Sequence, residues 1–182
     1  MDDGDLGGRL LPREEVLSWG RPKQGLLLLA RDGYAIPFML AWCGIVAVGV
    51  VSESGKSSVM GMAILSVMTV IGIFGLAGRY VIDAWLRSNT IYALTSQRIV
   101  IARARPFAAF LALDLDRLPP LELIEGANGR GTIRFGRLPA EVDIEDNPGW
   151  WLPVLDRVPQ FLAIADARQV FDQIQQAAGG RP

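Results

Sequence analysis

Two runs of uncharged, mostly apolar residues stand close together in the first half of the chain. The first extends from Gly33 to Ser52 and the second from Ser57 to Gly78, and neither contains Asp, Glu, Lys or Arg. A helix rises ~1.5 Å per residue, so each run is long enough to cross a hydrocarbon layer ~30 Å thick. Residues 53–56, which join the runs, are too few for a folded domain. The pattern predicts a transmembrane helical hairpin over residues 33–88, with spans at about 34–52 and 58–80.

Two buried helices of a soluble protein are the competing interpretation of these runs. Soluble core helices rarely remain uncharged over ~20 residues, and two in succession would be rarer still. Glycines recur at 72, 75 and 78 in the second run, a spacing that would let the first helix approach closely; glycine is also simply common in membrane helices.

Positive charge flanks the hydrophobic runs on both outer sides. The connecting loop carries only Lys56, beside Glu53, whereas basic residues precede the first run and follow the second: Arg13, Arg21, Lys23, Arg31, Arg79, Arg87 and Arg98. By the positive-inside rule we expect both termini in the cytoplasm. The acidic start of the chain is unlike a signal peptide, so we expect the hairpin to stay in the mature protein.

Residues 1–32 are predicted to form a cytoplasmic N-terminal segment. Its first part is rich in Gly and Asp, but Trp19 and the leucines at 26–29 are too apolar for a free tail. We expect these side chains to be buried, either at the bilayer surface or against the domain that follows.

The pattern changes after Asn89 to short runs of β-branched, aromatic and alternating apolar residues. These runs predict strands, the first two joined by a turn at Ser96–Gln97. The predicted strands cover residues 90–95, 98–102, 107–116, 121–125, 131–136, 150–152 and 161–164. An apolar stripe at helical spacing predicts a last helix over 166–178, followed by a tail, 179–182. The fold class is therefore α+β: a hairpin, then a small barrel or sandwich over 89–178 that is capped by a C-terminal helix.

Composition excludes several kinds of function. The net charge of −1 disfavours a nucleic-acid partner, which would require a basic surface. The chain has no histidine, so a Ser-His-Asp or Cys-His nucleophile is impossible. Cys43 is the single cysteine and lies in the first hydrophobic run, with no basic neighbour to activate it. We expect no catalytic residues, no cofactor and no metal site.

Arginines of the C-terminal domain are the remaining candidates for a site. Arg98, Arg103, Arg105, Arg130 and Arg134 could form a face for an anionic ligand or a partner, or could be scattered, solvated residues. Gly55-Lys-Ser57 lacks the first glycine of a phosphate-binding loop. The acidic residues between 141 and 146 lack the spacing of a calcium loop, so a solvated loop is favoured. The glycine-rich residues 126–131 could cradle an anion, although a hairpin turn explains them as well.

The segment from Thr90 to Ile101 resembles the opening hairpin of bacterial pleckstrin-homology-like membrane proteins. Those proteins often carry a Tyr-x-x-Thr-x-x-Arg-hydrophobic pattern here, matched by Tyr92, Thr95 and Arg98. Upstream, Trp19-Gly-Arg-Pro22 is similar to their Trp-x-Gly-x-Pro segment with the spacing changed by one residue. The resemblance implies a curved, partly closed β-barrel capped by a helix.

Taken with the hairpin, the resemblance implies a multi-pass protein of the bacterial inner membrane. We expect a non-catalytic binding or scaffolding module on the cytoplasmic face, whose partners are the lipid bilayer and a protein or a second copy of the chain. The alternatives are an accessory subunit of a membrane transport or secretion complex, or an enzyme that acts on lipids. The spans offer only Ser66 and Thr69 between Ser58 and Gly78, too few polar groups for a reaction centre.

Overall fold

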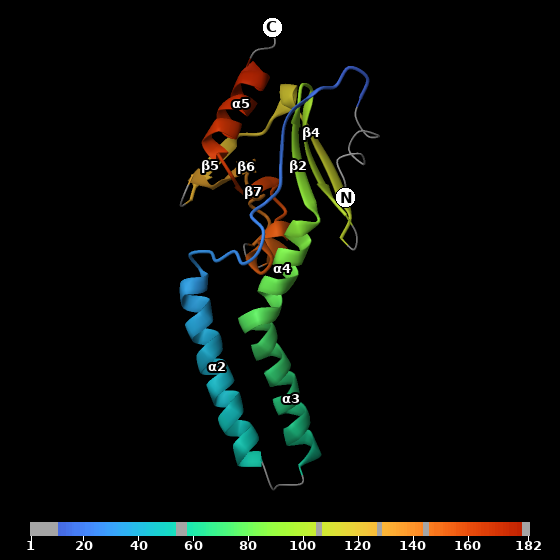
Figure 1. Ribbon diagram of the computed structural model, residues 1–182. Coiled ribbons are helices and arrows are strands. Elements are labelled where there is room, and N and C mark those ends of the chain that lie inside the picture. Colours follow the sequence, from blue (N-terminus) through green and yellow to red (C-terminus); the bar gives the residue numbers. More distant parts are fainter. Residues whose placement is uncertain (1–10, 54–57, 105–106, 127–128, 144–145, 180–182) are drawn as a thin grey trace. The chain divides into compact units, whose positions relative to one another are not determined.

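The computed structural model describes residues 11–53, 58–104, 107–126, 129–143 and 146–179, and its fold class is α+β (Figure 1). The chain divides into two compact units. One unit is a helical hairpin, residues 26–82. The other, here called the β unit, combines the chain up to Gly25 with the chain from Asp83 onward. The hairpin is therefore an insertion within the β unit's sequence.

The hairpin unit consists of two long apolar helices that lie side by side (Figure 1). Its elements are α2 (Asp32–Glu53), α3 (Val59–Ile73), the π-helical turn η1 (Phe74–Gly78) and α4 (Arg79–Ser88). The last of these, α4, continues into the β unit. Both predicted spans are helical, and the second continues to Ser88. Each helix is long and apolar enough to cross a membrane. Almost none of their hydrophobic windows is buried within the chain, as Ile45 and Val51, each 73% exposed, illustrate. They are therefore not core helices of this chain.

Glycines of the second helix bring it close to the first. A Cβ atom on Gly72 would lie 2.7 Å from Cys43 Sγ, and one on Gly75 would lie 2.5 Å from Met39 Sδ. The predicted close approach is confirmed at these two positions, whereas the space at Gly78 faces Phe74 of its own helix.

A buried ion pair joins α2 to the start of α4. Arg79 Nη2 lies 2.6 Å from Asp32 Oδ1, and each side chain is 5% exposed. The same guanidinium donates to the Tyr80 hydroxyl at 2.5 Å and lies 4.4 Å from the centre of the Tyr80 ring. Asp32 also accepts the Leu29 N–H at 2.7 Å. The two buried charges are thus paired with each other at the first residue of α2 and the first residue of α4.

In its described residues, the β unit contains two antiparallel sheets and not one closed barrel. The first has the order β1-β2-β3-β4 and the second β5-β6-β7. Their bounds are β1 (Val16–Gly20), β2 (Thr90–Thr95), β3 (Arg98–Arg103), β4 (Ala109–Asp114), β5 (Leu121–Glu125), β6 (Gly131–Phe135) and β7 (Gln160–Ile164). The helix α5 (Ala167–Gly179) follows. The prediction of six of these strands, of the turn at Ser96–Gln97 and of the last helix is confirmed.

Two parts of the sequence interpretation were wrong. No strand was predicted before the hairpin, but β1 pairs with β2, with Trp19 opposite Ala93 and Gly20 opposite Tyr92. The segment thus joins the later domain through its backbone, while the Trp19 side chain is 60% exposed and is not buried against that domain. Residues 150–152 were predicted as a strand. The structure instead has short 3-10 helices at η5 (Pro148–Trp150) and η6 (Pro153–Leu155).

Aromatic and aliphatic side chains from both sheets form the core of the β unit. The rings of Tyr92 and Phe161 stack at 4.7 Å, and Phe135 meets Phe161 edge-on at 5.1 Å. Ile99, Ile133 and Ile174 are fully buried and come from β3, β6 and α5. The apolar stripe of the last helix therefore covers this core, as its spacing predicts.

Candidate functional site

Arg98, the first of the predicted site residues, forms a buried ion pair. Its guanidinium binds Glu14 through two hydrogen bonds, Nε to Oε1 at 2.8 Å and Nη2 to Oε2 at 3.0 Å. Glu14 also accepts the Leu11 N–H and contacts the Thr95 hydroxyl. Burial alone would raise the pKa of the Glu14 carboxyl, but these hydrogen bonds outweigh burial and lower the pKa. Arg98 thus fastens the chain before β1 to the start of β3.

Two further predicted arginines contact the second sheet. Arg130 donates from Nη1 to the Ala163 carbonyl at 3.3 Å. Arg134 lies in β6 and pairs with Asp156, Nη2 to Oδ2 at 2.8 Å. Arg105 lies outside the described residues, as do the connecting loop at 54–57 and the tail at 180–182.

Arg103, the last residue of β3, differs from Arg98 and Arg134 because its partners are neutral. Its Nε donates to the Phe107 carbonyl at 2.8 Å and its Nη1 to the Val154 carbonyl at 2.9 Å. Within the part of the chain that the structure describes, no carboxylate pairs with this guanidinium. Burial lowers the pKa of the half-buried Arg103, and the Tyr92 hydroxyl opposes that shift only in part.

Arg103 lines a cavity of about 360 Å³ between the first sheet and the segment that precedes β7. The walls are largely apolar and come from β2, β3, β4 and β7: Tyr92, Ile101, Leu111 and Leu162. Arg157 and Asp156 also border the space. We call it the Arg103 cavity. It combines a half-buried cation with apolar walls, the arrangement typical of a small-molecule pocket.

Asp156, the acidic residue of this lining, accepts hydrogen bonds on both carboxylate oxygens from residues other than Arg103. Its Oδ2 accepts from Arg134, and its Oδ1 accepts from Asn147 Nδ2 at 2.8 Å and from the Val158 N–H at 2.9 Å. Asp156 therefore pairs with Arg134 and not with Arg103. Arg98, Arg130 and Arg134 are not among the residues that line the cavity.

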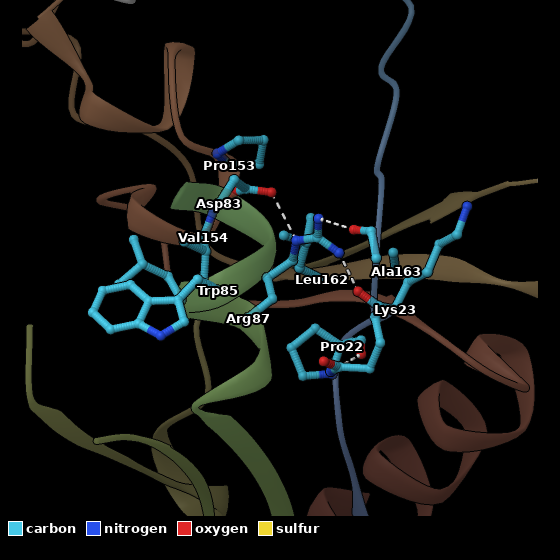
Figure 2. Close-up of polar contacts among 12 residues, drawn as sticks. Pro22, Lys23, Asp83, Trp85, Arg87, Pro153, Val154, Leu162 and Ala163 are labelled. Atoms are coloured by element: carbon cyan, nitrogen blue, oxygen red, sulfur yellow. Dashed lines mark hydrogen bonds and ion pairs between the residues drawn. The ribbon is translucent and has the colours of Figure 1, made fainter. Parts of the chain in front are cut away.

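A second polar cluster lies where the hairpin leaves and re-enters the β unit. Figure 2 shows Arg87 reaching from α4 toward the segment that carries Pro22 and Lys23. Arg87 is fully buried, and its Nε lies 2.7 Å from Asp83 Oδ2. Its Nη1 donates to the Lys23 carbonyl and its Nη2 to the Gly25 carbonyl at 2.7 Å. One side chain therefore binds the last residues before the hairpin and the last turn after it. We call this the junction cluster.

One peptide segment connects the junction cluster to the Arg103 cavity. The Val154 N–H donates to Asp83 Oδ1 at 3.2 Å, and the Val154 carbonyl accepts from Arg103 Nη1. The position of Arg103 is therefore fixed by the same residue that completes the hydrogen bonding of Asp83.

Sequence reasoning missed the junction residues and Glu14. Asp83 and Arg87 are four positions apart in a helix, a spacing that could have indicated a pair. Glu14 and Arg98 are 84 positions apart, and nothing in the sequence couples them.

Comparisons of the chain with protein-family models, with curated proteins and with solved structures found no match.

Proposed function

We propose that the protein is a membrane-anchored, non-catalytic binding module of the bacterial inner membrane. In this proposal the hairpin spans the bilayer, and the β unit, a pleckstrin-homology-like domain, lies on the cytoplasmic side with both termini. The observation that carries the proposal is the pair of long helices whose apolar side chains remain exposed. Exposing such a large apolar surface to water is unfavourable, and contact with lipid removes that cost.

The way the hairpin is inserted supports two crossings rather than one. β1 precedes the first helix, β2 follows the second, and the two strands pair with each other. This pairing supports a location of both ends of the insertion on one side of a membrane, as two crossings require. A cleaved leader that contained α2 would also remove β1 from its sheet. The basic residues on the outer flanks favour the cytoplasmic side.

The motif that suggests the family has structural roles in the β unit, which supports a similar domain. The Tyr92 hydroxyl accepts the Leu162 N–H and its ring stacks on Phe161. Thr95 accepts the Arg98 N–H at 3.0 Å and so closes the β2–β3 turn. In the described residues, seven strands in two sheets are followed by one helix, and this order supports the helix cap that the resemblance implies, although the sheets do not form the partly closed barrel. Tethering such a domain would raise its effective concentration for membrane components.

Membrane fractionation and thiol labelling test the proposal together. Wild-type protein should pellet with membranes, resist carbonate extraction and dissolve in mild detergent. In a Cys43→Ser background, Ser57→Cys should react in intact spheroplasts with a membrane-impermeant maleimide, whereas Ser88→Cys should react only after lysis. Protein in the soluble fraction would refute the anchor, and the reverse labelling pattern would refute the orientation alone.

A further inference from the structure

We infer that the Arg103 cavity binds an organic oxyanion, a phosphate or carboxylate attached to a small apolar group, with Arg103 pairing with the anion. This ligand would be the one recognised by the proposed module. The inference rests on the proposed function only for the module's place in the cell, because the cavity lies wholly within the β unit.

The charge of Arg103 is the first reason. Four arginines of the β unit, at 87, 98, 134 and 168, form ion pairs with carboxylates, whereas Arg103 forms none within the described residues. A half-buried guanidinium remains charged, so its field needs either solvent or an anion for compensation. Arg103 uses two of its five N–H donors on the Phe107 and Val154 carbonyls. The described residues take up none of its remaining donors.

The two fixed bonds also prepare the guanidinium for an anion. They hold Nε and Nη1 in place, so little side-chain entropy would be lost on binding. A guanidinium plane that is already oriented suits the planar or tetrahedral oxygens of a carboxylate or phosphate. Asp156, the acidic residue of the lining, pairs with Arg134 and accepts from Asn147 and the Val158 N–H rather than from Arg103.

The walls of the cavity define the rest of the ligand. Ile101, Leu111 and Leu162 offer apolar surface, and Gln160 adds an amide that itself donates to the Pro153 carbonyl. The volume of about 360 Å³ lies near the lower end of the ~300–1,000 Å³ range of ligand pockets. It suits one small ring or short chain beside the anion and not the paired tails of a lipid. A lipid could therefore enter only by its headgroup, and a soluble organic acid could enter whole.

Calorimetric titration of the full-length protein in phosphatidylcholine nanodiscs tests the site with phenyl phosphate as the probe. We expect saturable binding to the wild type, weaker binding of inorganic phosphate and none of phenol. Arg103→Gln should weaken phenyl phosphate binding roughly tenfold or more, since a charge-assisted pair is lost. Arg168→Gln removes an exposed arginine outside the cavity and should leave the affinity within about twofold.

A second variant separates the site from the stability of the fold. Ala109 lines the cavity and is exposed, so Ala109→Trp should fill the space while leaving Arg103 and both of its carbonyl partners intact. It should also weaken phenyl phosphate binding roughly tenfold with an unchanged thermal unfolding midpoint. Nanodiscs that contain phosphatidic acid then identify the source. Competition with phenyl phosphate assigns the cavity to a lipid headgroup, and its absence assigns it to a soluble anion; both results support the site.

Three outcomes would overturn the inference. The first is that the wild type does not bind phenyl phosphate at millimolar concentration. The second is that a folded Arg103→Gln binds it with wild-type affinity, and the third is that Arg168→Gln loses as much affinity as Arg103→Gln. None of them bears on membrane insertion, which the fractionation experiment decides separately.

Discussion

Arg87 joins the two stretches of the β unit between which the hairpin is inserted. It is fully buried, and its three hydrogen-bonding nitrogens reach Asp83 and the carbonyls of Lys23 and Gly25. A buried charge is tolerated only when its hydrogen bonds are satisfied, and here the backbone supplies what a single carboxylate could not. The cluster fixes the chain on both sides of the insertion.

We expect Arg87→Met to destabilise the protein by ~3–5 kcal/mol, because Asp83 would keep a buried charge without its cation. Denaturant unfolding of the purified protein in detergent, followed by tryptophan fluorescence, measures the loss. Arg168→Met is the matched control: its pair with Glu125 is 75% and 61% exposed and should contribute less than ~1 kcal/mol. Similar unfolding midpoints for the two variants would contradict this account of the junction.

Glu14 predicts a dependence of stability on pH. Its folded-state pKa lies below the ordinary value of 4.5, because hydrogen bonds from Arg98, Leu11 and Thr95 overcome burial. A lowered pKa stabilises the fold fully above the unfolded-state pKa, and the contribution disappears as the pH falls through the folded-state pKa. We expect the free energy of unfolding to decrease below about pH 4.5.

Glu14→Gln should remove this part of the acid sensitivity and cost ~1–3 kcal/mol at pH 7. Unfolding curves measured between pH 3 and pH 7 test both expectations. Glu125→Gln serves as the control, since its carboxylate is exposed and should leave the pH profile unchanged. An identical profile for Glu14→Gln and the wild type would show that another carboxylate is responsible.

At the scale of elements, the sequence predicts what local periodicity determines. The strands at 90–95 and 98–103 alternate clearly enough to be recognised, and so does the stripe of α5. Residues 150–152 misled because two tryptophans and a leucine resemble a strand. Asn147 caps the Gly149 N–H and prolines begin both short helices, so turn chemistry determines that stretch. β1 was missed because an edge strand with exposed side chains has no alternating pattern.

The packing of α2 against α3 predicts a disulfide. A Cβ atom at position 72 would lie 2.7 Å from Cys43 Sγ. In a disulfide, bond lengths and angles place each Cβ about 3 Å from the opposite sulfur. We therefore expect Gly72→Cys to form an intramolecular disulfide with Cys43 under mild oxidation, detected as protection from a maleimide mass tag.

Gly61→Cys is the control for this experiment. It lies in the same helix, but the neighbours of its Cβ would be Ser58 and Glu53 rather than Cys43. It should therefore remain open to labelling after oxidation. A disulfide in Gly61→Cys and none in Gly72→Cys would mean that the helices pack in a different register.

For the whole molecule, the decisive feature is that a hydrophobic hairpin interrupts a sheet. The sequence predicts the hairpin from composition, but not that residues 16–20 would pair with residues 90–95 on its far side. Pairing across such a separation depends on tertiary contacts rather than on local pattern. The sequence could not predict the Arg103 cavity either. Its walls come from three strands of the first sheet and from the segment 154–162, and only folding brings them together.

This topology predicts that the β unit survives without its insertion. β1 and β2 are neighbours, the core of Tyr92, Phe135 and Phe161 lies within the unit, and Arg87 binds carbonyls that precede residue 26. Replacing residues 26–82 with a flexible Gly-Ser linker costs only loop-closure entropy, which grows slowly with length. We expect a soluble product with a β-rich circular dichroism spectrum and cooperative unfolding, and with the phenyl phosphate affinity of the full chain.

The same replacement combined with Arg87→Met should be much less stable, because the short linker cannot substitute for the junction cluster. If the shortened chain still pellets with membranes, the attachment must come from the β unit, and the role assigned to the hairpin would be wrong.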